Sequence, residues 1–99
     1  MRIPKGSDTM AERRVTIGWA NGLHARPAAI FVHAAMAVGV PVTVAKGDGR
    51  PVNAASPLGV LSLGARHGDE IVLASDAAGA DAALDRLAKL VMEGLDELP

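Results

Sequence analysis

The chain has no cysteine and only two aromatic residues, one Trp and one Phe, among its 99 residues. Without cysteine it has no disulfide framework, no thiol nucleophile and no thiolate zinc site. Three scattered histidines make a poor ligand set, so we predict no metal site. So few aromatic residues provide no base-stacking platform. A net charge of −1 also lacks the basicity of a general phosphate-backbone binder. We therefore predict no nucleic-acid partner.

Long apolar runs are also missing. None reaches the roughly 18 to 20 residues of a membrane span, and the polar residues 1–14 lack a signal-peptide core. We predict no membrane insertion, a cytoplasmic location and a monomer. Ninety-nine residues suffice for one domain but not for two.

The charges are unevenly divided along the chain. Residues 1–50 contain seven basic and three acidic side chains, a net of +4, and residues 51–99 contain three basic and eight acidic ones, a net of −5. This asymmetry either steers a charged partner to one side of the domain or is scatter over solvated faces. We expect the basic half to hold the reactive site and the final acidic helix to lie toward the other part of the domain.

The first nine residues show no apolar periodicity and contain Pro4 and Gly6. We predict a disordered N-terminal extension at 1–9 and a folded domain at 10–99. Met10 stands directly before the first organised segment, so either Met1 or Met10 is the native start.

The patterns along residues 14–95 predict alternating strands and helices. Period-two alternation of Val15, Ile17 and Trp19 indicates a strand, and an Asp-Gly turn between extended runs indicates a hairpin. We predict strands at 14–19, 40–46, 50–54 and 70–75, and helices at 25–38, 57–63 and 78–95. The apolar residues at helical spacing are Ala28, Phe31, Val32, Ala35 and Met36 in the first long helix, and Leu84, Leu87, Val91 and Leu95 lie on one face of the last. The order βαββαβα predicts an α+β open-faced sandwich, a four-stranded antiparallel sheet with three helices on one face.

The segment NGLHARPAA, residues 21–29, carries the most chemistry. His24 stands where a glycine turn leads into a helix, beside backbone N–H groups that have no partner within the helix. These groups form an anion site, and the positive helix end disfavours the imidazolium. Arg26 adds a cation that pairs with phosphate oxygens. The pattern suits a histidine that accepts and donates a phosphoryl group, and a helix-capping histidine beside a solvated arginine is the alternative.

The motif NGLHARPAA resembles the active-site motif of the HPr family, the histidine-containing phosphocarriers of the bacterial phosphoenolpyruvate-dependent sugar phosphotransferase system. The KGDGR hairpin, the segment VNAASPLGVLSLGA and HGDEIVLAS follow in the family's order. The resemblance implies that His24 receives a phosphoryl group at Nδ1 from phospho-enzyme I and passes it to enzyme IIA domains of sugar permeases. It implies that Arg26 stabilises that group. It also implies a carrier that is not a turnover enzyme and that binds no cofactor.

Ser56 has two interpretations. The resemblance implies a serine that an ATP-dependent kinase phosphorylates in some bacteria, which links the carrier to transcription regulators. Ala55 and Pro57 depart from the family's usual neighbours of that serine. The local pattern instead predicts an N-cap followed by proline in the first helical turn.

We predict a docking patch for partner proteins at Ala25, Pro27, Ile30, Leu58 and Leu61, while Val60 and Leu63 face the core. An exposed apolar patch beside a reactive histidine suits a protein that is passed between partners; the alternative is that these residues are packed away. His33 and His67 are expected at the surface.

Two other functions remain open. One is a regulatory interaction module controlled by phosphorylation at Ser56 or His24. The other is a carrier for a nitrogen-linked or dihydroxyacetone-kinase branch of the same system, which shares the chemistry but not the acceptor.

Overall fold

A computed structural model describes residues 11–20, 22–23 and 25–94 of the chain. The predicted N-terminal extension, 1–9, lies outside these residues, so it and the boundary at residue 10 remain predictions. The elements are β1 (Ala11–Thr16), α2 (Ala25–Ala37), β2 (Thr43–Lys46), β3 (Val52–Asn53), α3 (Pro57–Ser62), β4 (Glu70–Ser75) and α4 (Asp81–Glu93).

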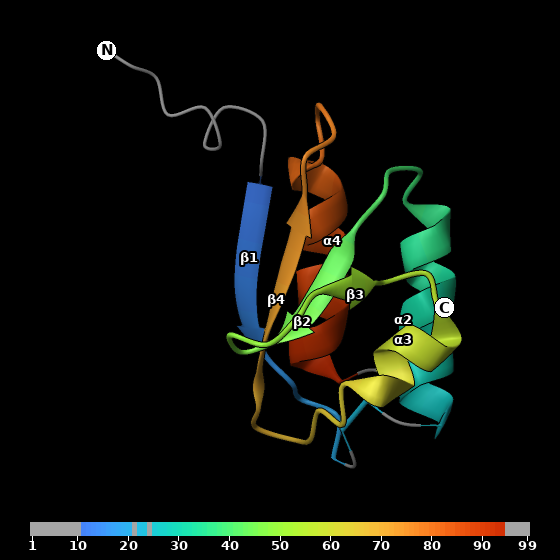
Figure 1. Ribbon diagram of the computed structural model, residues 1–99, viewed down its shortest axis with the longest axis vertical. Helices are drawn as coiled ribbons and strands as arrows, with labels where there is room; N and C mark the ends of the chain where they lie inside the picture. Colours follow the sequence, from blue (N-terminus) through green and yellow to red (C-terminus); the bar gives the residue numbers. More distant parts are fainter. Residues whose placement is uncertain (1–10, 21, 24, 95–99) are drawn as a thin grey trace.

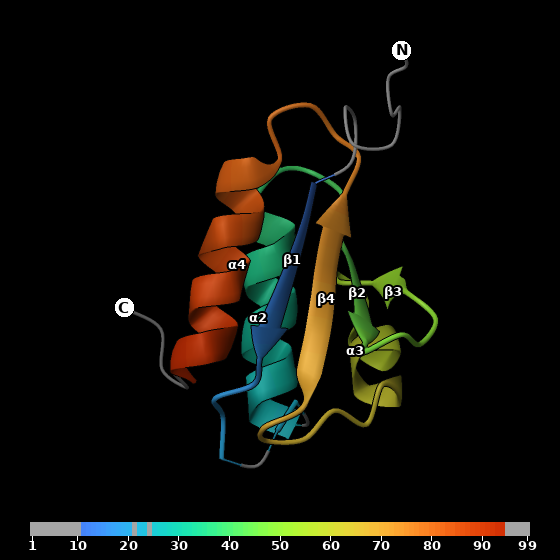
Figure 2. The same cartoon turned by 90° about the vertical axis from the view of Figure 1, so that its left-hand side faces the viewer.

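The four strands form one antiparallel sheet in the order β1-β4-β2-β3. Figures 1 and 2 show the three helices together on one side of the sheet, with the other side uncovered by any helix. The predicted fold class and the order βαββαβα are confirmed.

Alternation along the strands places the core on the helical side of the sheet. Val15 pairs with Ile71, and Val44 pairs with Leu73, and all four are buried. Their neighbours Arg14, Glu70 and Thr43 are exposed. Successive side chains of a strand point to opposite faces, so this pattern fixes the register of the sheet.

The first strand lies three residues earlier than predicted. Ile17 and Trp19 are buried as expected, but the chain leaves β4 after Thr16 and crosses toward the last helix. There the Gly18 N–H donates to the Val91 carbonyl at 2.9 Å. The alternating pattern continues past the paired strand because Ile17 and Trp19 belong to the same hydrophobic core as Val15.

The two long helices bury most of the predicted positions. Ala28, Phe31, Val32 and Ala35 are buried on α2, and Leu84, Leu87 and Val91 are buried on α4; Leu95 lies outside the described residues. Met36 shares the helical spacing of these residues but is 66% exposed, because it follows Ala35, the last buried residue of α2. α4 begins at Asp81 instead of residue 78, because Gly79 has a φ of 75° that a helix does not adopt.

Ion pairs connect the basic first half of the chain to the acidic second half. Arg13 lies 2.8 Å from Asp85 and 3.2 Å from Asp81, which ties β1 to α4. The hydrogen bonds that the Arg13 guanidinium donates to Asp85 and Asp81 raise the pKa of Arg13. Arg14 also pairs with Glu70 at 3.0 Å. The expectation that the acidic helix lies apart from the basic half is wrong, because α4 packs on β1 and its carboxylates meet that strand's arginine.

Candidate functional site

The backbone leading to residue 24 is anchored by the N–H groups of Gly22 and Leu23. The Leu23 N–H donates to the Ala65 carbonyl at 2.9 Å, and the Leu23 side chain is fully buried. Gly22 has a φ of 76°, and a side chain there would collide with Ala65 and lie 2.6 Å from the Cα of Arg66. Only glycine fits such a close backbone approach at positive φ. The sequence pattern predicted Gly22 only as part of a turn that leads into the helix and missed this contact, although its place two residues before the histidine was the signal.

α2 begins directly after residue 24, at Ala25. His24 itself lies outside the described residues. Arg26, in the first turn, is exposed, and no described carboxylate pairs with it, so its guanidinium faces solvent at this helix end. Pro27 is half-buried and tolerated there, because the first turn needs no N–H from it. A helix N-terminus with a free guanidinium is an arrangement that holds anions.

Ser56 caps α3 as predicted. Its side-chain oxygen accepts a hydrogen bond from the Gly59 N–H at 3.1 Å, and Pro57 occupies the first turn. This satisfies one of the N–H groups that a helix leaves free at its start. The serine side chain is half-buried. Phosphorylation of Ser56 stays a prediction.

The residues predicted for docking divide into exposed and buried ones. Leu58 is 79% exposed and Leu61 is 42% exposed, whereas Val60 is fully buried and Leu63 half-buried. Ile30 was predicted to be exposed, and this is wrong: it is only 8% exposed. α2 contacts both α3 and α4, so its buried face is wide enough to cover Ile30, Phe31 and Val32 in succession. Nothing is described for the side chain of Ala25.

His33 and His67 are exposed, as predicted. Within the described residues, no group of three or more His, Asp or Glu side chains is placed to hold a metal ion. The described part of the chain also contains no helix that is long and apolar enough to cross a membrane.

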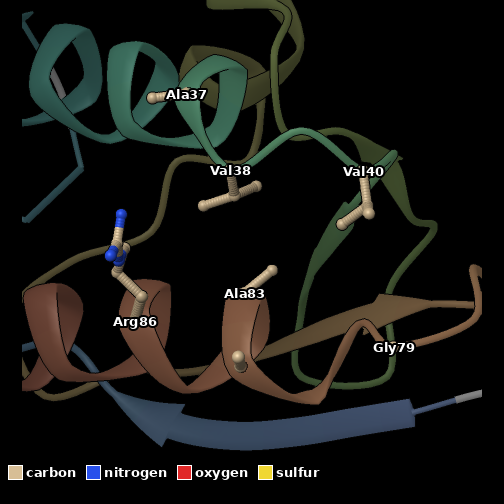
Figure 3. Close-up of a pocket in the computed structure, with 7 residues that line it drawn as sticks. Ala37, Val38, Val40, Gly79, Ala83 and Arg86 are labelled. Carbon is tan, nitrogen blue, oxygen red and sulfur yellow. The ribbon is translucent and has the colours of Figure 1, made fainter.

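A cavity of about 230 Å³ lies between the end of α2 and the start of α4. Figure 3 shows Val38, Val40 and Ala83 around it, with Arg86 at one side. α2 has 13 residues and rises about 1.5 Å per residue, so this cavity is roughly 20 Å from the helix end that follows residue 24. It is therefore not part of the candidate site.

Comparisons with known proteins agree on one family. The model of the family described as "PTS HPr component phosphorylation site" matches residues 11–93. The chain is 77% identical over 90 residues to the phosphocarrier protein HPr of Streptomyces coelicolor, which covers 91% of this chain and 97% of that protein. It is 39% identical over 89 residues to the phosphocarrier protein NPr of Shewanella violacea, covering 90% of this chain and 97% of the relative.

Solved structures show the same fold. The crystal structure of a phosphocarrier protein HPr from Bacillus anthracis superposes with a TM-score of 0.77 at 39% identity. The superposition covers 83% of this chain and 96% of that one.

Proposed function

This chain belongs to the HPr family, the phosphocarriers of the phosphotransferase system, and from that premise we propose that His24 is its phosphorylated residue. The observation that carries the proposal is the structure on either side of residue 24 in the chain: the Leu23 N–H is bonded to the Ala65 carbonyl, and α2 begins at Ala25. A nucleophile at that place meets the N-terminal amides of a 13-residue helix.

The chemistry follows from the neighbours of His24. The positive end of a helix disfavours a cation next to it, so it favours the neutral, nucleophilic form of an imidazole at that place. A bond forms between Nδ1 and phosphorus as the bond between phosphorus and the donor breaks. The exposed Arg26 guanidinium and the free N–H groups of the first turn then stabilise the negative oxygens of the phosphoryl group. Transfer to an acceptor reverses these steps, so the protein ends each half-reaction chemically changed and is not a turnover enzyme.

We propose phospho-enzyme I as the donor and enzyme IIA domains as acceptors, in the cytoplasm. The proposed docking patch consists of Pro27, Leu58 and Leu61, and it excludes the buried Ile30. Ala25 is included because it lies next to His24 in the sequence. α2 and α3 pack against each other, so the exposed leucines of α3 lie on the helix that adjoins the one bearing Arg26. Exposed apolar side chains beside a reactive group suit short-lived binding to several partners.

The test is incubation of the full chain with enzyme I and phosphoenolpyruvate, followed by mass measurement after acid and after base. We expect one phosphate that is lost in acid and kept in base, as a phosphohistidine requires. His24→Ala should abolish it. His33→Ala is the matched control, because His33 is an exposed histidine on α2, and this variant should be phosphorylated like the parent. An intact chain that stays unlabelled, or a label that survives in His24→Ala, contradicts the proposal.

The choice of branch is tested by the acceptor. Identity of 77% with an HPr against 39% with an NPr favours the sugar branch over the nitrogen-linked one. Phosphorylated protein should therefore be discharged faster by an enzyme IIA domain of a sugar permease than by a nitrogen-linked one, and the reverse order would reassign the branch.

A further inference from the structure

A second cavity, of about 360 Å³, lies between the β2–β3 hairpin and the end of α3. It is lined by Lys46, Gly49, Arg50, Val52, Ser62 and Leu63, and we call it the hairpin pocket. Its volume is at the lower end of the range of about 300 to 1,000 Å³ in which small-ligand sites fall. None of these six residues belongs to the candidate phosphorylation site.

The hairpin pocket carries two cations. Arg50 is exposed, and within the described residues it has no carboxylate partner. The Lys46 ammonium lies 3.5 Å from Asp69, and an ammonium has three donors, so donors remain for a ligand. Asp48, in the same hairpin, lies 3.9 Å from Arg14. The pocket therefore keeps unused positive charge that fits a dianion better than a neutral molecule.

Its remaining polar group is an acceptor. The Ser62 hydroxyl donates to the Gly59 carbonyl at 2.6 Å, so only its lone pairs are left for a ligand. Such an oxygen accepts a hydrogen bond from a ligand hydroxyl. Val52 and Leu63 are half-buried and offer an apolar surface for C–H groups between the anion and that hydroxyl.

We propose that the hairpin pocket binds a small hydroxylated phosphate ester. Lys46 and Arg50 take the phosphate, which has a charge of about −1.5 to −2 at pH 7, and Ser62 accepts from a hydroxyl. A bound ester would change the surface next to Leu61, which belongs to the docking patch.

Glycerol 3-phosphate, titrated into ¹⁵N-labelled full-length protein at about 0.1 M salt, is the probe. We expect saturable shifts of the amide signals of Gly49, Arg50 and Leu63. Inorganic phosphate, which has no carbon-bound hydroxyl, should bind about two- to ten-fold more weakly, the effect of one hydrogen bond. Glycerol should not bind.

Three variants assign the contacts. Arg50→Gln should weaken binding about ten-fold, as expected for a charge-assisted bond. Arg86→Gln removes the same charge at the other cavity and should bind like the parent. Ser62→Ala should remove the preference for glycerol 3-phosphate over inorganic phosphate.

Some results would overturn the proposal: no saturable shift, equal binding of the two phosphates by the parent, or equal losses in the Arg50 and Arg86 variants. Circular dichroism of each variant verifies that it is folded. His24→Ala should bind glycerol 3-phosphate unchanged, so this result does not depend on the proposed phosphorylation of His24.

Discussion

Replacing Gly22 by alanine tests how the fold holds the residue that precedes His24. Two costs are combined at this position. Alanine at a φ of 76° adopts the left-handed conformation, which costs about 1 to 2 kcal/mol. Its Cβ would also collide with backbone atoms of Ala65 and Arg66, and such overpacking costs about 1 to 3 kcal/mol. We expect Gly22→Ala to lower the free energy of unfolding by about 2 to 5 kcal/mol.

Two other glycines separate these costs. Gly39 has a φ of 81° but no atom within 4 Å of an added Cβ, so Gly39→Ala should show the conformational cost alone, about 1 to 2 kcal/mol. Gly18 is not at positive φ, but a Cβ there would collide with the Met92 carbonyl. Gly18→Ala should therefore show the steric cost alone, about 1 to 3 kcal/mol.

Urea unfolding measures all three variants. Trp19 is the single tryptophan and is 2% exposed, so its fluorescence reports unfolding, and far-ultraviolet circular dichroism provides a second probe. Since a domain has about 5 to 15 kcal/mol in total, Gly22→Ala should remain folded in water but unfold at much lower urea. If Gly22→Ala loses no more stability than Gly39→Ala, the close approach to Ala65 does not constrain this segment and the reasoning is refuted.

Three further changes have defined outcomes. Ser56→Ala should lower the free energy of unfolding by about 1 kcal/mol through loss of the cap, whereas Ser56→Asp should keep most of the cap's stabilisation because aspartate also caps helices. Equal losses of stability in urea unfolding of the two variants would contradict the capping role. The hydrogen bond from the Arg66 N–H, and after it the charge of Lys46, lowers the pKa of Asp69 in the folded protein. The ionised carboxylate therefore stabilises the folded state at pH values above the unfolded pKa of about 3.9, and this stabilisation is lost as the pH falls through the lower folded pKa. Asp69→Asn should therefore destabilise the protein at pH 7 and have little effect at pH 2, as thermal unfolding at both values would show. Leu58→Ser, at an exposed position, should leave the melting temperature nearly unchanged but slow phosphorylation by enzyme I. Val60→Ala, in the core, should lower the free energy of unfolding by about 1.5 kcal/mol or more. A large loss of stability in Leu58→Ser would remove Leu58 from the docking patch.

Local patterns predicted the elements better than their ends. The second hairpin strand shrinks from the predicted 50–54 to Val52–Asn53. Pro51 has no N–H to donate to a ladder, and the Asn53 side chain accepts from the Ala55 N–H at 2.8 Å, which already starts the turn toward α3. Pro51 and Asn53 are both visible in the sequence. How far they shorten β3 depends on its pairing with β2, which the sequence alone does not specify.

Burial on α2 depended on packing that the sequence alone does not specify. A helix that lies on a sheet has one buried stripe, which places Ile30 at its edge. α2 contacts both α3 and α4, and such contacts between helices are known only when the whole chain is folded. The exposed Leu58 and Leu61 were predictable because α3 is too short to bury every apolar residue that it carries.

The pairing of β1 with β4 has a consequence for synthesis of the protein. In the described part of the chain, β1 is an edge strand whose one partner in the sheet is β4. Val15 therefore cannot pair until Ile71 has been synthesised. At the usual rate of about 5 to 20 residues per second, translation of the intervening chain takes roughly 3 to 11 s. The ion pairs of Arg13 with Asp81 and Asp85 form later still, because these two residues are synthesised after Ile71. The nascent chain can form α2 early, but its N-terminal strand stays unpaired until the ribosome has released nearly the whole domain.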